Sequence, residues 1–186
     1  MNRPATLLVL LLAGCGGGSR PTGIRAVETP ADDVAEYQPR WRSHTVDSTQ
    51  YRKVFLAGTI DMGRSADWQA ALVARFRDSI GGRWLFFNPR RREFHASPAE
   101  MEYQVAWELA HLEAADLIVM NLLGDSRSPI SLLEMGLYAR SGKLFVACSP
   151  DYYRYDNVRI TCRRYGVPLY DSLTALLDDL PQQSDE

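Results

Sequence analysis

The fold of this chain is decided by residues 116–148, which read DLIVMNLLGDSRSPISLLEMGLYARSGKLFVAC. The apolar runs at 116–120 and 144–148 are each typical of a short buried strand. Between them, Ser128-Pro129 combines a helix N-cap with a proline at the first helical position, and Gly142 marks the end of that helix. We therefore expect a helix that connects two strands of one sheet.

The same alternation of strand and helix continues on both sides of this segment. We expect further strands at residues 53–58, 84–87 and 167–170, and helices that begin near residues 65–67, 97, 157 and 171–172. Five strands separated by helices predict a parallel sheet with helices on both faces. The expected fold class is α/β, a three-layer sandwich around a five-stranded parallel sheet of the flavodoxin or Rossmann-like type, with strand order 2-1-3-4-5.

The sequences of two expected helices indicate how their faces are used. The helix that begins at Ser97 carries an apolar stripe of Met101, Val105, Leu109 and Leu112. The opposite stripe of this helix is expected to be a solvated face and holds Gln104, Glu108 and His111. The helix after Ser128 is apolar almost all round, which predicts burial between the sheet and its neighbours.

The composition is that of an ordinary globular protein. Of the 186 residues, 46% are hydrophobic and 24% are charged, and the formal net charge is −2. These proportions exclude a disordered, collagenous or multi-pass membrane chain. The charge gives no basic footprint for nucleic acid, so no nucleic-acid partner is expected.

The N-terminal residues are typical of an export signal. A basic start and an apolar run at 7–13 predict a short signal peptide over residues 1–14. Residues 12–15, Leu-Ala-Gly-Cys, resemble the lipobox of bacterial lipoproteins. That resemblance implies a lipid on Cys15 and a place in the cell envelope, and Gly16 would suit the outer membrane of a cell with two membranes. The alternative is a misassigned start codon ahead of a cytoplasmic enzyme.

The rest of the chain divides into a tether, one domain and a tail. Glycines and prolines interrupt residues 15–50, which we expect to carry the lipid and form a flexible tether. The domain is expected over residues 51–182, followed by a tail at 183–186. Cys148 and Cys162 could pair in an oxidising compartment, but we favour two buried thiols, because the sequence does not show that their Cα atoms lie close enough for a disulfide.

Glu134 is the first candidate for chemistry. It lies on the apolar helix about one and a half turns from the helix start, where an ionised carboxylate is costly unless it is paired or faces a cavity. A partly desolvated carboxylate in a cleft is suited to act as a nucleophile or general base. The alternative is a structural glutamate that is satisfied by an arginine or a backbone group.

Several motifs along the chain resemble successive signatures of the nucleoside 2-deoxyribosyltransferase-like family. They occur in the family's order and include residues 55–61 (FLAGTID), 88–91 (NPRR), 104–108 (QVAWE), 128–136 (SPISLLEMG) and 153–158 (YRYDNV). The resemblance implies that Glu134 attacks the anomeric carbon of a deoxynucleoside and expels the base. The sugar would then pass from a covalent intermediate to another base or to water. Related enzymes form oligomers in which neighbours complete the site, which implies that this chain could form a homo-oligomer.

Four further residues are candidates for binding the substrate, a nucleoside or nucleotide. They follow the strand ends or begin the Glu134 helix, and they are Gly58, Asp61, Asn88 and Ser128. The transferases of the family have an aspartate where Ser128 stands, so a base-contacting carboxylate could be missing and hydrolysis or another N-glycoside stays open. Asp61 could equally be a loop or cap residue. The arginines at 90–92 could hold a phosphate or simply be solvated.

The sequence predicts neither a cofactor nor a metal site. Gly58 stands without a G-x-G-x-x-G or P-loop pattern, and the histidines and cysteines lack metal-ligand spacing. The expected function is cleavage of an N-glycosidic bond through Glu134. The alternative is a lipoprotein that binds a nucleotide-like ligand without turnover.

Overall fold

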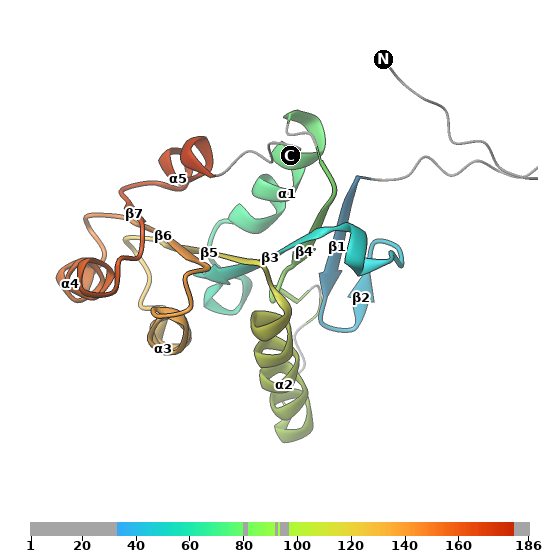
Figure 1. Ribbon diagram of the computed structural model, residues 1–186. Helices are drawn as coiled ribbons and strands as arrows, with labels where there is room; N and C mark the ends of the chain where they lie inside the picture. Colours follow the sequence, from blue (N-terminus) through green and yellow to red (C-terminus); the bar gives the residue numbers. More distant parts are fainter. Residues whose placement is uncertain (1–32, 80–81, 92, 94–96, 181–186) are drawn as a thin grey trace, which may run out of the picture. The chain divides into compact units, whose positions relative to one another are not determined.

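The computed structural model describes residues 33–79, 82–91, 93 and 97–180 (Figure 1). The expected signal peptide, the lipidation site at Cys15 and the tail at 183–186 lie outside the described residues. No helix within the described part of the chain is long and apolar enough to cross a membrane.

One mixed sheet organises the described residues. Its strands are β1 (Val34–Gln38), β2 (Trp41–Arg42), β3 (Arg52–Gly58), β4 (Trp84–Phe87), β5 (Leu117–Leu122), β6 (Leu144–Cys148) and β7 (Leu169–Tyr170). The helices are α1 (Trp68–Ser79), α2 (Pro98–Ala114), α3 (Pro129–Tyr138), α4 (Tyr155–Tyr165) and α5 (Leu173–Asp179), with short 3-10 helices η1 (Ser48–Gln50) and η2 (Asp61–Gly63). The strand order is β2-β1-β4-β3-β5-β6-β7. Every pair is parallel except β1 with β2.

The α/β class is as expected, but the prediction of five strands is wrong, because the sheet has seven. The five expected strands follow the order β4-β3-β5-β6-β7, and β1 and β2 extend the sheet beyond β4. The tether expected over 15–50 therefore does not continue through residues 34–42. β1 was missed because its apolar run, Val34-Ala35, is only two residues long and is followed by Glu36. In the sheet, Val34 packs on one side, while Ala35 and Tyr37 pack on the other.

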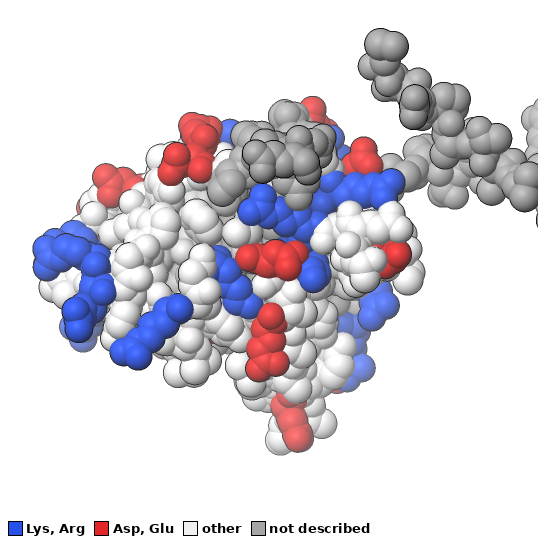
Figure 2. All heavy atoms as spheres, viewed as in Figure 1, with Lys and Arg blue, Asp and Glu red and all other residues white. Residues whose placement is uncertain are grey.

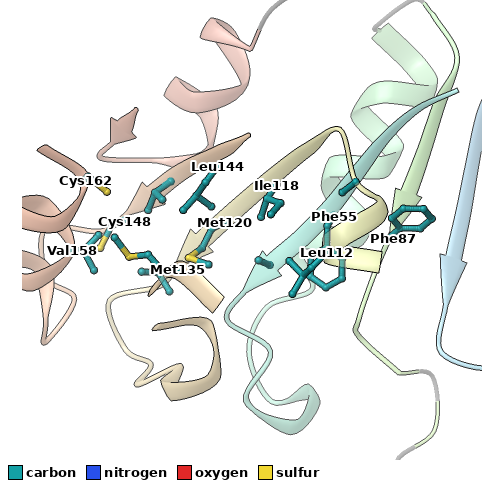
Figure 3. Close-up of a cluster of buried hydrophobic side chains, with 14 of the residues drawn as sticks. Phe55, Phe87, Leu112, Ile118, Met120, Met135, Leu144, Cys148, Val158 and Cys162 are labelled. Carbon is teal, nitrogen blue, oxygen red and sulfur yellow. The ribbon is translucent and has the colours of Figure 1, made fainter. Parts of the chain in front are cut away.

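Helices cover both faces of the sheet (Figure 1). On one face, α1 and α5 pack against strand residues such as Val54 and Leu56. On the other face, Phe55 and Met120 pack with side chains from α2, α3 and α4 (Figure 3). Successive strand residues point to opposite faces, so each central strand contributes to both cores. Three layers result.

Both cysteines in the described residues are free thiols. Cys148 on β6 and Cys162 on α4 are buried in the core shown in Figure 3. Burial raises the pKa of Cys148 to about 12 and the pKa of Cys162 to about 11. Neither thiol is therefore ionised near neutral pH, and both act as small apolar core residues.

The faces of α2 and α3 differ from the expectation. The expected inner stripe of α2 lies largely outside: Met101 is 60% exposed, Val105 45% and Leu109 41%, although Leu112 is buried. The expected solvated stripe, Gln104, Glu108 and His111, is half-buried instead. On α3, the prediction of burial all round is wrong as well, because Ile130, Leu133 and Leu137 are exposed. We call the exposed side chains of Met101, Val105, Leu109, Ile130, Leu133 and Leu137 the apolar face.

Candidate active site

A cavity of about 550 Å³ lies where β3 ends, between α2 and α3. In parallel sheets, ligands bind beyond the carboxyl ends of the strands, where the strand order reverses. Here that point falls between β3 and β5, because β4 lies on one side of β3 and β5 on the other. The residues that line the cavity include Gly58, Asp61, Arg64, Arg91, Gln104, Glu108, Ser128, Ser131 and Glu134.

Gly58 lets the first loop of the cavity pass close to the neighbouring strand. Its φ is +124°, and a Cβ at this position would lie 2.2 Å from the backbone oxygen of Asn121. The next residue, Thr59, donates its backbone N–H to the same oxygen at 2.9 Å. Gly58 therefore shapes the wall through its backbone, since any side chain would collide with β5.

The Glu134 carboxylate faces the cavity from α3 and is only 8% exposed. No hydrogen bond or ion pair holds it among the described residues, so the alternative of a paired structural glutamate does not describe it. Burial, followed by the negative charge of Glu108, raises the pKa of Glu134 to about 8. An unpaired carboxyl group at a cavity wall is available to react with what the cavity binds.

Glu108 is a second carboxylate of the cavity, and it was missed in the sequence because it lies on the polar stripe of α2. Burial raises the pKa of Glu108, while the Gln104 amide and the charge of Arg91 lower it. Gln104 donates its Nε2 proton to Glu108 and accepts a hydrogen bond from Arg91. The motif at 104–108 carried the signal that could have identified Glu108, because it places a glutamine and a glutamate on one helical face.

Ser128 lines the cavity, and its hydroxyl bonds to neighbouring hydroxyls rather than capping α3. It has a left-handed backbone, with φ 39° and ψ 54°, and its side chain caps no helical N–H. Its Oγ lies 2.8 Å from the hydroxyls of both Thr59 and Ser126. Ser126 in turn donates to Asp61 Oδ1 at 2.9 Å. The expectation that Ser128 caps α3 is thus wrong, because neighbouring hydroxyls hold its side chain.

Asn88 lies beside the site but does not line the cavity. Its Nδ2 donates to Glu36 Oε1 at 2.8 Å, and its Oδ1 accepts the backbone N–H of Arg90 at 3.0 Å. Both functional groups of the amide are therefore used to join the end of β4 to β1 and to shape the turn that follows. The structure brings Gly58, Asp61, Ser128 and Glu134 together and leaves Asn88 behind the wall.

The arginines after β4 are held by protein acceptors. Arg90 donates to Gln69, Ser65 and the backbone oxygen of Ala66, and lies 3.4 Å from the carboxylate of Asp67. Arg91 donates to Gln104 and to the backbone oxygen of Glu100, and pairs with the Glu100 carboxylate. These contacts position the cavity wall. Arg92 lies outside the described residues.

The comparison with known families agrees with the geometry. The sequence model of the family described as "Nucleoside 2-deoxyribosyltransferase like" matches residues 51–152. The chain belongs to this family. The match runs through β3, β4, β5 and β6 and includes Glu108, Ser128 and Glu134. No curated protein matches the chain.

In this nucleoside 2-deoxyribosyltransferase-like protein, the distinctive feature of the site is a pair of carboxyl groups. Glu108 and Glu134 both line the cavity, and the charge of Glu108 adds to the burial that raises the pKa of Glu134. In the described ranges, no group of three or more His, Cys, Asp or Glu side chains could hold a metal ion. The chemistry that these side chains can support is nucleophilic and acid–base catalysis by carboxyl groups.

Proposed function

We propose that this protein cleaves the N-glycosidic bond of a nucleoside or deoxynucleoside and passes the sugar to another base or to water. One observation carries the proposal: the buried, unpaired carboxyl group of Glu134 shares a nucleoside-sized cavity with Glu108. The family of the chain supports the same class of reaction. Glu134 is the proposed nucleophile, and Gly58, Asp61 and Ser128 form the part of the wall that meets the substrate.

The proposed reaction has two steps through an oxocarbenium-like state. In the first, a Glu134 carboxylate oxygen forms a bond to the anomeric carbon while the bond from that carbon to the base nitrogen breaks. The departing base keeps the electron pair and takes a proton from the Glu108 carboxylic acid. In the second, a base nitrogen or water attacks the same carbon, loses its proton to Glu108 and releases Glu134.

The first step requires an ionised Glu134 and a protonated Glu108, and one proton shared by the pair satisfies both requirements. Burial, followed by the charge of Glu108, raises the pKa of Glu134 to about 8, so Glu134 holds a proton near neutral pH. When the proton moves to Glu108, Glu134 becomes a nucleophile and Glu108 becomes an acid. The protein needs no outside proton for this change, so the singly protonated pair is the reactive form.

The direct test is to capture the covalent intermediate. The full chain is incubated with deoxynucleosides, quenched in acid, digested and analysed by mass spectrometry, and we expect a deoxyribosyl mass on the peptide that contains Glu134. Glu134→Gln should abolish both the adduct and base release. Glu113→Gln, on the exposed side of α2, is the matched control and should change neither. If the unmodified protein gives neither adduct nor free base, the proposal is wrong.

Binding without turnover is the second candidate function, and Ser128 favours it because this hydroxyl stands where the transferases carry a carboxylate. In that case nucleosides or nucleotides should raise the melting temperature of the protein, and no free base should form on prolonged incubation. Glu134→Gln should then bind as well as the unmodified protein, since an uncharged residue removes the cost of the buried carboxylate.

We also propose that the chain is exported and anchored to the cell envelope through a lipid on Cys15. Fractionation of cells that produce the full chain should place the protein in the membrane fraction, and mass spectrometry should find the lipid on residue 15. Cys15→Ser should release the protein from that fraction. A soluble cytoplasmic protein that retains residues 1–14 would contradict the proposal.

We further propose that a second copy of the chain covers the apolar face. Six large apolar side chains on α2 and α3 are exposed, and three of them, Met101, Val105 and Ile130, also line the cavity. Exposed apolar patches are typical of interaction sites. Leu133→Asp should shift the molar mass measured by light scattering from dimer or higher to monomer. Ile160→Asp, at a similarly exposed position on α4, is the control and should leave the mass unchanged.

A further inference from the structure

Three buried hydroxyls connect Asp61 to the cavity wall. Ser126 donates to Asp61 Oδ1 at 2.9 Å, Ser126 Oγ lies 2.8 Å from Ser128 Oγ, and Ser128 Oγ lies 2.8 Å from Thr59 Oγ1. Thr59 also accepts the backbone N–H of Leu123 at 3.1 Å. Only Asp61 and Ser128 line the cavity, and the other two hydroxyls lie behind its wall.

The direction of every hydrogen bond in this chain follows from its end. A hydroxyl has one proton to donate, and an ionised carboxylate can only accept. Because Ser126 gives its proton to Asp61, it must accept from Ser128. Because Ser128 gives its proton to Ser126, it must accept from Thr59. All three protons therefore point toward Asp61.

This order determines what Ser128 can offer to a ligand. Its only proton is committed to Ser126, and one of its two lone pairs accepts from Thr59. The remaining lone pair makes Ser128 an acceptor on a cavity wall. Hydrogen bonds in a chain polarise one another, so the negative charge of Asp61 strengthens this acceptor.

Backbone strain at Ser128 indicates that its placement matters. Ser128 has φ 39° and Asp61 has φ 49°, a left-handed region that residues with a side chain rarely adopt. Ser128 also precedes α3 without capping it, although serine is among the preferred N-caps. The hydroxyl chain compensates for both costs, as is common for strained residues at functional sites.

We propose that Asp61, acting through Ser126, holds Ser128 as a hydrogen-bond acceptor, so that the site selects bases with an amino group at this point over bases with a carbonyl oxygen there. Ser126 is then a positioning residue for substrate choice. The inference rests on the proposed function, because it takes the ligand to be a nucleoside.

The test compares matched pairs of substrates that differ only in this group: deoxycytidine with deoxyuridine, and deoxyadenosine with deoxyinosine. For the unmodified protein we expect kcat/KM, or affinity in calorimetry, to favour the amino member of one pair by about 10- to 100-fold. In Ser126→Ala the Ser128 proton is free to turn into the cavity. The preference should then fall about tenfold, because Ser128 can donate to a carbonyl.

Two variants separate this role from a structural one. Ser126→Thr keeps the hydroxyl and should retain the preference, whereas Asp61→Asn should reduce it, because its amide can donate to Ser126 and reverse the chain. Ser141→Ala, which removes a hydroxyl beyond the other end of α3, is the control and should leave the preference unchanged.

The outcomes distinguish this inference from the proposed function. If nucleosides react or bind and the preference in Ser126→Ala equals that of the unmodified protein, the inference is overturned and the proposed function stands. If nucleosides bind without reaction and the preference falls in Ser126→Ala, the inference stands and the proposed catalysis does not. If no nucleoside binds the unmodified protein, both are overturned.

Discussion

The two helical layers of this protein follow opposite rules. On α1, the apolar side chains face the sheet: Trp68, Leu72 and Phe76 are all buried. On α2, Gln104 and Glu108 are half-buried, whereas Met101 and Val105, which line the same cavity, are exposed. A helix that covers a sheet normally buries its apolar stripe, because that burial drives its packing. The layer that obeys this rule is scaffold, and the layer that departs from it holds the cavity and the apolar face.

Charge is distributed unevenly within the layer formed by α2, α3 and α4. Basic side chains gather over α4, while both signs occur elsewhere on the face that Figure 2 shows. By contrast, the carboxyl group of Glu134 is buried without a cation to balance it. An uncompensated buried carboxylate is costly, and such costs are concentrated at functional sites.

The largest expected effect is on catalysis, in the layer that departs from the rule. Glu134→Gln should reduce kcat/KM for base release by about 10⁴-fold or more, because an amide cannot form the glycosyl intermediate. The measurement is the rate of base release followed by chromatography. A rate within tenfold of the unmodified protein would show that α3 carries no nucleophile.

The next effect concerns Glu108. We expect kcat/KM of the unmodified protein to fall as the pH rises through about 8, because the carboxyl pair then loses its single proton. Glu108→Gln should lower the rate by about 10²- to 10⁴-fold and remove this alkaline decline, since its activity needs only an ionised Glu134. The pKa of Glu134 should also fall in this variant, because a neighbouring negative charge is gone. An unchanged pH profile would exclude Glu108 from the reaction.

In the layer that obeys the rule, the expected effect is on stability alone. Phe76 of α1 is buried against the rings of Trp84 and Phe86, with centroids 4.9 and 5.0 Å away. Phe76→Ala should lower the free energy of unfolding by about 3–5 kcal/mol, as measured by urea denaturation. Activity per folded molecule should stay unchanged. A fall in that activity would show that α1 is not merely scaffold.

The last effect is a gain in stability at alkaline pH from removing the buried carboxyl group. The folded state binds the Glu134 proton more tightly than the unfolded state, so this group reduces stability as the pH rises from about 4.5 to about 8. A pKa raised from 4.5 to about 8 corresponds to about 5 kcal/mol, so Glu134→Gln should match the unmodified protein near pH 4 and melt about 10–20 °C higher near pH 9. The measurement is calorimetry at both pH values, with Glu113→Gln as the control. Equal melting temperatures at pH 9 would mean that the carboxylate is solvated.

The difference between the layers also explains how much of the site could be predicted. Glu134 could be identified because one acidic residue interrupts an apolar helix, and Gly58 and Asp61 because they follow a buried strand. Glu108 could not, since a polar stripe on a helix normally faces water. Ser126 and Thr59 are ordinary loop residues in the sequence, and their role arises only because a hydroxyl from each reaches Ser128.

By itself, the sequence determined the α/β class and the family, because these follow from local periodicity and from motifs within short segments. The order of the five strands from β3 to β7 was expected only from the usual topology of that fold class. The tertiary structure alone decided that β1 joins β4, that Glu108 of α2 lies in the same cavity as Glu134, and that three hydroxyls form a hydrogen-bonded chain with Asp61. These features depend on contacts between residues far apart in the chain. Local preferences cannot specify such contacts, because each is determined by what the rest of the fold places opposite it.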